Sequence, residues 1–353
     1  MGESTTAVEV PLIDISGWDS GPHAQARIAA RVGAAAADPG FMRVVGHGIP
    51  GQIHDGVREA IDLFFDRPPA GKLRYAPPEP DSERGYRAPA VPGAAESFHL
   101  GTQARDFPDR ALPAAVYPAN IWPVGLPKFQ PQVMAWFDAA QRLARRLTRI
   151  FAVALDVPEG FFEPYTGHPI DVLRLEHRPP APAGAPVAGD GCAAPVGVAG
   201  VPLAAAGTAP AEGGSAGHTE PGLLRVVWAE GAPLQFADDL GRWHDVAPWP
   251  DALVVHVGDL LARWTNDRWQ APPFRAALPP APAGGGGQRW RAAALSHGAD
   301  FDALVTTLPT CVGPDRPDYY EPVTVARHLA VRLGGRWQRL ITGAYGGRDF
   351  RQG

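Results

Sequence analysis

The chain has 353 residues, 45% of them hydrophobic, and a net charge of −5. It is long enough to bury a large core, and it lacks the clustered basic face that nucleic-acid binders carry. Its two cysteines, Cys192 and Cys311, make no disulfide framework, no apolar signal segment opens the chain, and no run of about 18 apolar residues predicts a membrane span. We therefore expect a cytoplasmic protein that binds neither nucleic acid nor membrane.

The N-terminal part alternates short apolar runs with helical patterns. Apolar runs predict strands at residues 10–14 and 41–45. An alanine-rich segment predicts a helix over 24–37, and a second helix is expected over 49–65, before the breaker Pro68-Pro69.

The clearest helix is predicted over residues 132–155. Apolar side chains recur there at three- and four-residue steps, and arginines lie between them. Such an amphipathic helix is expected to act as a brace that packs one face against a sheet.

Further along the chain, the pattern changes to short strands separated by turn residues. Candidate strands are 171–176, 223–228, 234–236, 253–257 and 292–296. Many short strands with this spacing favour a sandwich or a barrel.

Residues 179–217 differ from the rest of the chain. They contain 13 Ala, nine Gly and seven Pro but two charged residues, Asp190 and Glu212. A segment of this composition buries no core, so we interpret it as a flexible insertion, either a lid or disordered. Residues 284–287, four glycines, predict a second flexible tip at a hairpin turn.

His218-Thr219-Glu220 is the motif that points to chemistry. On a strand, residues i and i+2 share a face, so an imidazole and a carboxylate project together, as two ligands of a facial iron triad do. The alternative is that both are ordinary polar residues of a ligand cavity.

Several segments carry a family resemblance, in the right order along the chain. They are GFMRVVGHGIP at 40–50, GY at 85–86, ESFHLG at 96–101, NIWP at 120–123, LRL at 173–175 and GDLL at 258–261. Together they resemble the isopenicillin N synthase-like branch of the Fe(II)/2-oxoglutarate-dependent dioxygenase superfamily. The resemblance implies a mainly β, α+β fold, a double-stranded β-helix (jelly roll) with N-terminal helices and a long bracing helix.

The same resemblance implies one domain over residues 1–353. Residues 1–125 would be an N-terminal oxygenase-like region and 126–335 the jelly-roll core that carries the flexible insertion 179–217. Residues 336–353 would be a C-terminal tail. The implied function is oxidoreductase chemistry on a small molecule with Fe(II) and 2-oxoglutarate.

The family holds its iron with His-x-Asp and a distal His. His218 matches the first ligand, and Glu220 stands at the Asp position, one methylene longer. These two are the candidate metal ligands and catalytic residues. Phe274 falls at the distal His, and because phenylalanine cannot coordinate a metal, we expect it to be a wall of a repurposed pocket or simple core filling.

The family binds the far carboxylate of 2-oxoglutarate with an Arg-x-Ser pair. Arg289 or Arg291 is the candidate here, although neither has a Ser two positions on, and the alternative for each is a surface ion pair. Glu176 and Arg178 replace neutral residues that face the ligand in the family. They would recognise a substrate or form a buried pair.

Three other histidines, His244, His256 and His297, are candidates for a replacement ligand, against the alternative that each is a hydrogen-bonded structural residue. Two hypotheses follow. One is an oxygenase with an incomplete iron site. The other is an iron-independent, non-redox enzyme or a catalytically inactive binding protein on the same fold.

Overall fold

The computed structural model describes residues 9–79, 82–89, 94–180, 217–276 and 289–342. Residues 181–216 of the expected insertion, the expected tip at 284–287 and Cys192 lie outside the described residues. Among the residues described, no helix combines the length and the apolar character that crossing a membrane requires.

The protein is built on a large sheet whose neighbouring strands are antiparallel except for the parallel pair β1 and β2. Its order is β1 (Leu12–Asp14), β2 (Phe41–Val45), β9 (Leu253–Val257), β6 (Leu224–Glu230), β11 (Trp290–His297), β5 (Val172–Arg178), β4 (Glu96–Gly101) and β3 (Gly85–Arg87). A smaller sheet has the order β10 (Phe274–Ala276), β7 (Leu234–Ala237) and β8 (Trp243–Val246), and β12 (Leu304–Val305) pairs with β13 (Val323–Thr324).

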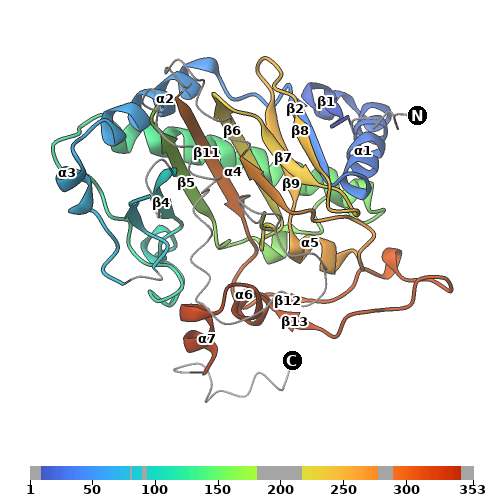
Figure 1. The fold of residues 1–353 in the computed structure, drawn as a ribbon. Helices are drawn as coiled ribbons and strands as arrows, with labels where there is room; N and C mark the ends of the chain where they lie inside the picture. The colour runs from blue at the N-terminus through green and yellow to red at the C-terminus, as the bar shows by residue number, and fades with distance from the viewer. Residues whose placement is uncertain (1–8, 80–81, 90–93, 181–216, 277–288, 343–353) are drawn as a thin grey trace.

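Helices cover one face of the large sheet, where α4 runs behind the strands (Figure 1). The helices are α1 (Pro22–Ala37), α2 (Gly51–Phe65), α3 (Pro69–Leu73), α4 (Phe129–Ala154), α5 (Asp259–Trp264), α6 (Val325–Leu333) and α7 (Gly335–Thr342). Short 3₁₀ turns occur at Ser16–Ser20, Ala104–Asp106, Glu163–Tyr165 and Pro309–Cys311. Helices α6 and α7 lie at the opposite end of the sheet from α2 (Figure 1).

Strand β11 shows how the sequence separates two cores. Its side chains alternate between the faces of the sheet. Ala293 and Leu295 enter the core beneath the helices, and Trp290, Ala292 and Ala294 enter a second core shared with the smaller sheet. The second core is therefore the interior of a two-sheet sandwich, which is the predicted jelly roll.

The predicted elements agree closely with the observed ones. The apolar stripe of the 132–155 pattern is the buried face of α4, with Trp136, Leu143 and Phe151 fully enclosed. Two expectations need correction. Residues 336–342 of the expected tail belong to α7, and His218-Thr219-Glu220 is not a strand, because His218 makes a single bridge to Phe274 and the chain then turns.

Candidate functional site

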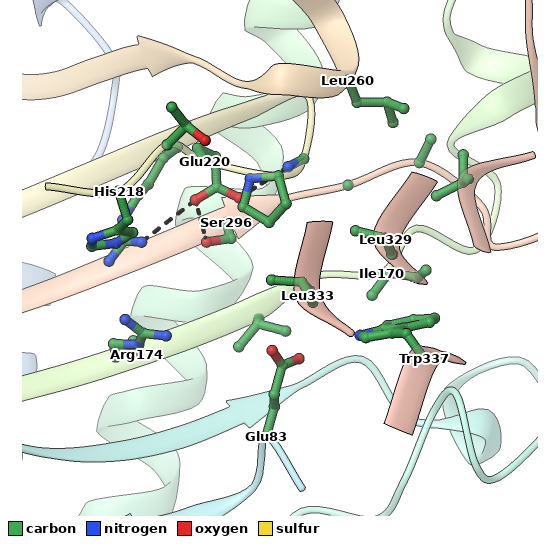
Figure 2. A pocket seen from close by; sticks show the side chains of 18 residues that line it. Glu83, Ile170, Arg174, His218, Glu220, Leu260, Ser296, Leu329, Leu333 and Trp337 are labelled. Carbon is green, nitrogen blue, oxygen red and sulfur yellow. Dashed lines mark hydrogen bonds and ion pairs between the residues drawn. The ribbon is translucent and has the colours of Figure 1, made fainter. Parts of the chain in front are cut away.

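A cavity of about 90 Å³ lies between the interior of the sandwich and the two C-terminal helices (Figure 2). Polar side chains line one end, namely Arg174, His218, Glu220, Arg225 and Ser296. Apolar side chains line the other, namely Ile170, Leu260, Leu329, Leu333 and Trp337. The structure thus brings the two residues of the His-x-Glu motif into one pocket.

Backbone contacts fix the position of this motif. His218 and Phe274 exchange hydrogen bonds, with N to O distances of 3.2 and 3.0 Å. Two residues on, the Glu220 carbonyl accepts from the Asp259 amide at 2.6 Å. At Gly258 a Cβ would collide with the Gly222 carbonyl, so a glycine there allows the close approach of the two segments.

The carboxylate of Glu220 is 1% exposed and fully engaged. One oxygen accepts from the Gly222 amide at 3.1 Å, and the other from the Ser296 hydroxyl at 2.8 Å and from Arg225 Nη1 at 3.4 Å. Figure 2 draws these contacts as dashed lines. Burial raises the pKa of Glu220, and the Arg225 charge opposes that rise. A buried ion pair therefore occupies the position that the resemblance assigns to the second iron ligand.

The Phe274 ring contacts two imidazoles. Its ring centroid is 4.3 Å from that of His218 and 4.3 Å from that of His256. On another side, the Arg225 guanidinium lies over the same ring at 5.0 Å, a favourable cation–π arrangement. Phe274, which the resemblance places at the distal ligand, therefore contacts both histidines.

Both imidazoles are neutral at ordinary pH. Burial, together with the charges of Arg225 and Arg174, lowers the pKa of His218 to about 3. Burial also lowers the pKa of His256 well below its usual value. Since His256 faces Phe274 and stacks on Phe41 at 4.6 Å, it packs as a core residue, although it lies beside the site.

These residues do not fit Fe(II). Glu220 already has a cationic partner, and an iron ion bound to it would lie close to the Arg225 guanidinium, so the two cations would repel each other in a buried setting. In the part of the chain that is described, no three His, Cys, Asp or Glu residues are arranged to hold a metal. His218 does offer a ligand nitrogen at the site, since its Nε2 is buried without a hydrogen-bond partner among the described residues.

The expectation for Arg289 and Arg291 is corrected by their placement. Arg291 donates to Asp62 at 2.8 and 2.9 Å, and Arg289 to Asp62 and Asp66 at 2.9 and 3.1 Å. Both arginines thus pair with α2 and its C-terminal end, on the face of the sheet opposite His218. The structure therefore agrees with the alternative expectation, in which each arginine forms an ion pair.

Trp290, between these arginines, faces the sandwich interior instead. It lines a second small cavity together with His218 and Arg225, of about 20 Å³. A space of that size holds about one water molecule. The described residues therefore offer 2-oxoglutarate neither a guanidinium from β11 nor room in this cavity.

Glu176 lines this small cavity, but Arg178 lines neither of the two. Glu176 forms its ion pair with Arg174, at 3.7 Å, rather than with Arg178.

His244 lies outside the site, where it contacts Asp238 at 2.9 Å. His297 is also elsewhere, paired with Asp171 at 2.8 Å beneath the sheet. Neither histidine meets His218.

Three side chains that line the cavity were not predicted from the sequence. Arg225 lies within the apolar run predicted as a strand, and a lone charge in such a run was the available signal, because arginine is rarely fully buried without a partner. Arg174 is hidden in the same way in β5. Trp337 carried no signal, since it falls in the expected tail.

Comparisons with known proteins agree with this fold. Residues 10–125 match the family model described as the N-terminal region of non-haem dioxygenase in morphine synthesis. A 2-oxoglutarate-Fe(II) type oxidoreductase of Aspergillus fumigatus is 28% identical, covering 74% of this chain and 75% of that protein. The oxidoreductase ppzC of Metarhizium rileyi is 27% identical, covering 92% and 87%.

Solved structures are similar over nearly the whole chain. A 2OG-Fe(II) oxygenase family protein from Caulobacter crescentus has a TM-score of 0.76 at 23% identity, covering 93% of this chain and 99% of that one. The dioxygenase for auxin oxidation in rice has a TM-score of 0.66 at 23% identity, covering 95% and 96%.

Fold and sequence together define a jelly-roll protein of the oxygenase type. More specifically, the chain is similar over nearly its whole length to proteins of the Fe(II)/2-oxoglutarate-dependent dioxygenase superfamily, which confirms the resemblance predicted from the sequence.

Proposed function

We propose that this protein binds a small organic molecule in the cavity beside His218, and that it does so without Fe(II) or 2-oxoglutarate. The observation that carries the proposal is the buried Glu220–Arg225 ion pair, at the position that the resemblance assigns to the second iron ligand. The Arg225 guanidinium supplies there the positive charge that iron supplies in the family.

Electrostatics supports the replacement of the iron ion by the Arg225 guanidinium. A carboxylate buried without a partner is strongly destabilising, and Arg225 provides that partner within the chain itself. Phe274 adds to the effect, because its ring takes the place of the third ligand and packs against the guanidinium. An iron ion would have to displace both side chains.

The geometry favours binding over acid–base catalysis. An efficient general base has a pKa near the working pH, whereas the pKa of His218 is lowered to about 3. Glu220 is held by three hydrogen-bond donors and is buried. Neither group is poised to exchange a proton with a ligand at neutral pH.

A second candidate function is an Fe(II)/2-oxoglutarate oxygenase with an incomplete site. The names of the relatives favour it, since those proteins are 2-oxoglutarate-Fe(II) oxidoreductases. In that case His218 and Glu220 would be metal ligands, and Glu220 would have to leave Arg225 before it could coordinate.

Turnover of 2-oxoglutarate to succinate distinguishes the two candidate functions. The protein is purified without oxygen, supplied with Fe(II), ascorbate and 2-oxoglutarate, and then exposed to air, and succinate is measured. We expect no succinate above that of a His218→Ala variant. Succinate formation that His218→Ala abolishes would overturn the proposal and establish the oxygenase.

A further inference from the structure

The two ends of the main cavity differ in chemistry (Figure 2). Arg174 and His218 lie together at the polar end, and Leu329, Leu333 and Trp337 at the other. A pocket divided in this way suits a ligand with one charged or polar group and an apolar body.

Arg174 is the cation available to a ligand. Among the described residues its guanidinium makes one polar contact, the ion pair with Glu176 at 3.7 Å. That separation is too long for a hydrogen bond, so the guanidinium keeps its N–H donors for another acceptor. Arg225 is committed differently, because it neutralises Glu220.

His218 supplies a second unsatisfied group at the same end. Its Nε2 is buried and has no hydrogen-bond partner among the described residues. A neutral imidazole with its proton on this nitrogen donates one hydrogen bond. Leaving such a group unpaired in a buried place is destabilising, and an acceptor on the ligand would remove that cost.

The far end adds a constraint on charge. Glu83 lines the cavity there, and Figure 2 places its carboxylate near Leu333. A second carboxylate on the ligand would approach Glu83 and be repelled. The apolar end therefore favours an uncharged body.

We propose that the ligand is a small monocarboxylic acid whose carboxylate is held by Arg174 and His218 and whose apolar body packs against Leu329, Leu333 and Trp337. This inference rests on the proposed function, because it concerns the same cavity without iron. The cavity volume of about 90 Å³ favours a small apolar body.

The probe is phenylacetate, titrated into metal-free protein in a calorimeter. Two matched compounds isolate the charge: phenylacetamide has the same shape without charge, and 4-carboxyphenylacetate carries a second carboxylate at the far side of its ring. We expect phenylacetate to bind at least about tenfold more tightly than either, because charge-assisted hydrogen bonds are about twice as strong as neutral ones.

Variants test whether Arg174 causes the preference for phenylacetate over phenylacetamide. Arg174→Gln should make phenylacetate and phenylacetamide bind about equally, and Arg174→Lys should keep part of the preference because it keeps the charge. Arg327→Gln is the matched control, since it removes an exposed arginine from α6, the helix that supplies Leu329. It should leave the preference unchanged. Thermal unfolding of each variant shows whether it is folded.

The outcomes separate this inference from the proposed function. Equal binding of the acid and the amide by the unaltered protein overturns the carboxylate inference, as does a preference that survives in Arg174→Gln or the absence of phenylacetate binding at millimolar concentration. Binding that requires added Fe(II) overturns the proposed function, whatever the preference between acid and amide.

Discussion

Breaking the Glu220–Arg225 pair is the most informative stability experiment. The two side chains are 1% and 7% exposed, and their N to O distance is 3.4 Å. Arg225→Met leaves the Glu220 carboxylate buried without its cation, and removing one partner of a buried pair costs about 3–5 kcal/mol. Glu220→Gln should be costly for the same reason, because it leaves a buried guanidinium.

The double variant Arg225→Met with Glu220→Gln should recover most of that loss, because neither charge remains. A surface pair provides the control. Arg58 and Glu230 also form an ion pair, but their side chains are 36% and 32% exposed, and Arg58→Met should cost less than about 1 kcal/mol.

Chemical denaturation at neutral pH measures the four variants and the unaltered protein. The unaltered protein, the two single variants at 220 and 225 and their double variant form a double-mutant cycle. The expected coupling between Arg225 and Glu220 is at least about 2 kcal/mol, within the range found for residues that share one network. If Arg225→Met costs no more than Arg58→Met, the buried pair is not what stabilises this site, and our electrostatic account fails.

Three further predictions concern the same region. Burial lowers the pKa of His218 to about 3 and that of His256 well below its usual value. As pH falls below 6.5, the unfolded chain therefore takes up protons that these two imidazoles do not bind in the folded protein, and unfolding experiments should show stability falling by up to about 3 kcal/mol per pH unit from this pair. A flat profile from pH 6.5 to 4.5 would contradict this prediction. Phe274→His combined with Arg225→Met should raise the affinity for Co(II), followed by its absorption spectrum, since it adds a nitrogen ligand and removes the competing cation; unchanged affinity would mean that Phe274 does not stand at the third ligand position. Arg332→Ala should loosen α6 and weaken phenylacetate binding several-fold in calorimetry, because Arg332 ties α6 to Asp259 and Thr219 beside His218; unaltered binding would show that this anchor is dispensable.

Much of the fold is predictable because hydrophobic periodicity is local. The apolar stripe of α4 and the runs of β6 and β9 follow from residues adjacent in sequence. The C-terminal helix α7 is not predictable in this way. It is short and begins with Gly335, and its buried Trp337 packs over a cavity formed by distant segments.

The site was predictable in part. The family pattern led to His218, Glu220 and Phe274, which the structure brings together. The face of Arg289 and Arg291 was not predictable, because β11 is buried on both sides and its sequence shows no alternation that would mark one face. The partner of Glu220 depends on the turn after it, which brings Arg225 back across the carboxylate.

We propose that Arg225 holds the place of iron. Equilibrium dialysis of the unaltered protein against Fe(II) without oxygen, followed by metal analysis, tests it most directly. We predict far less than one iron per chain at micromolar Fe(II), and the same amount in His218→Ala. One iron per chain that disappears in His218→Ala would contradict the account.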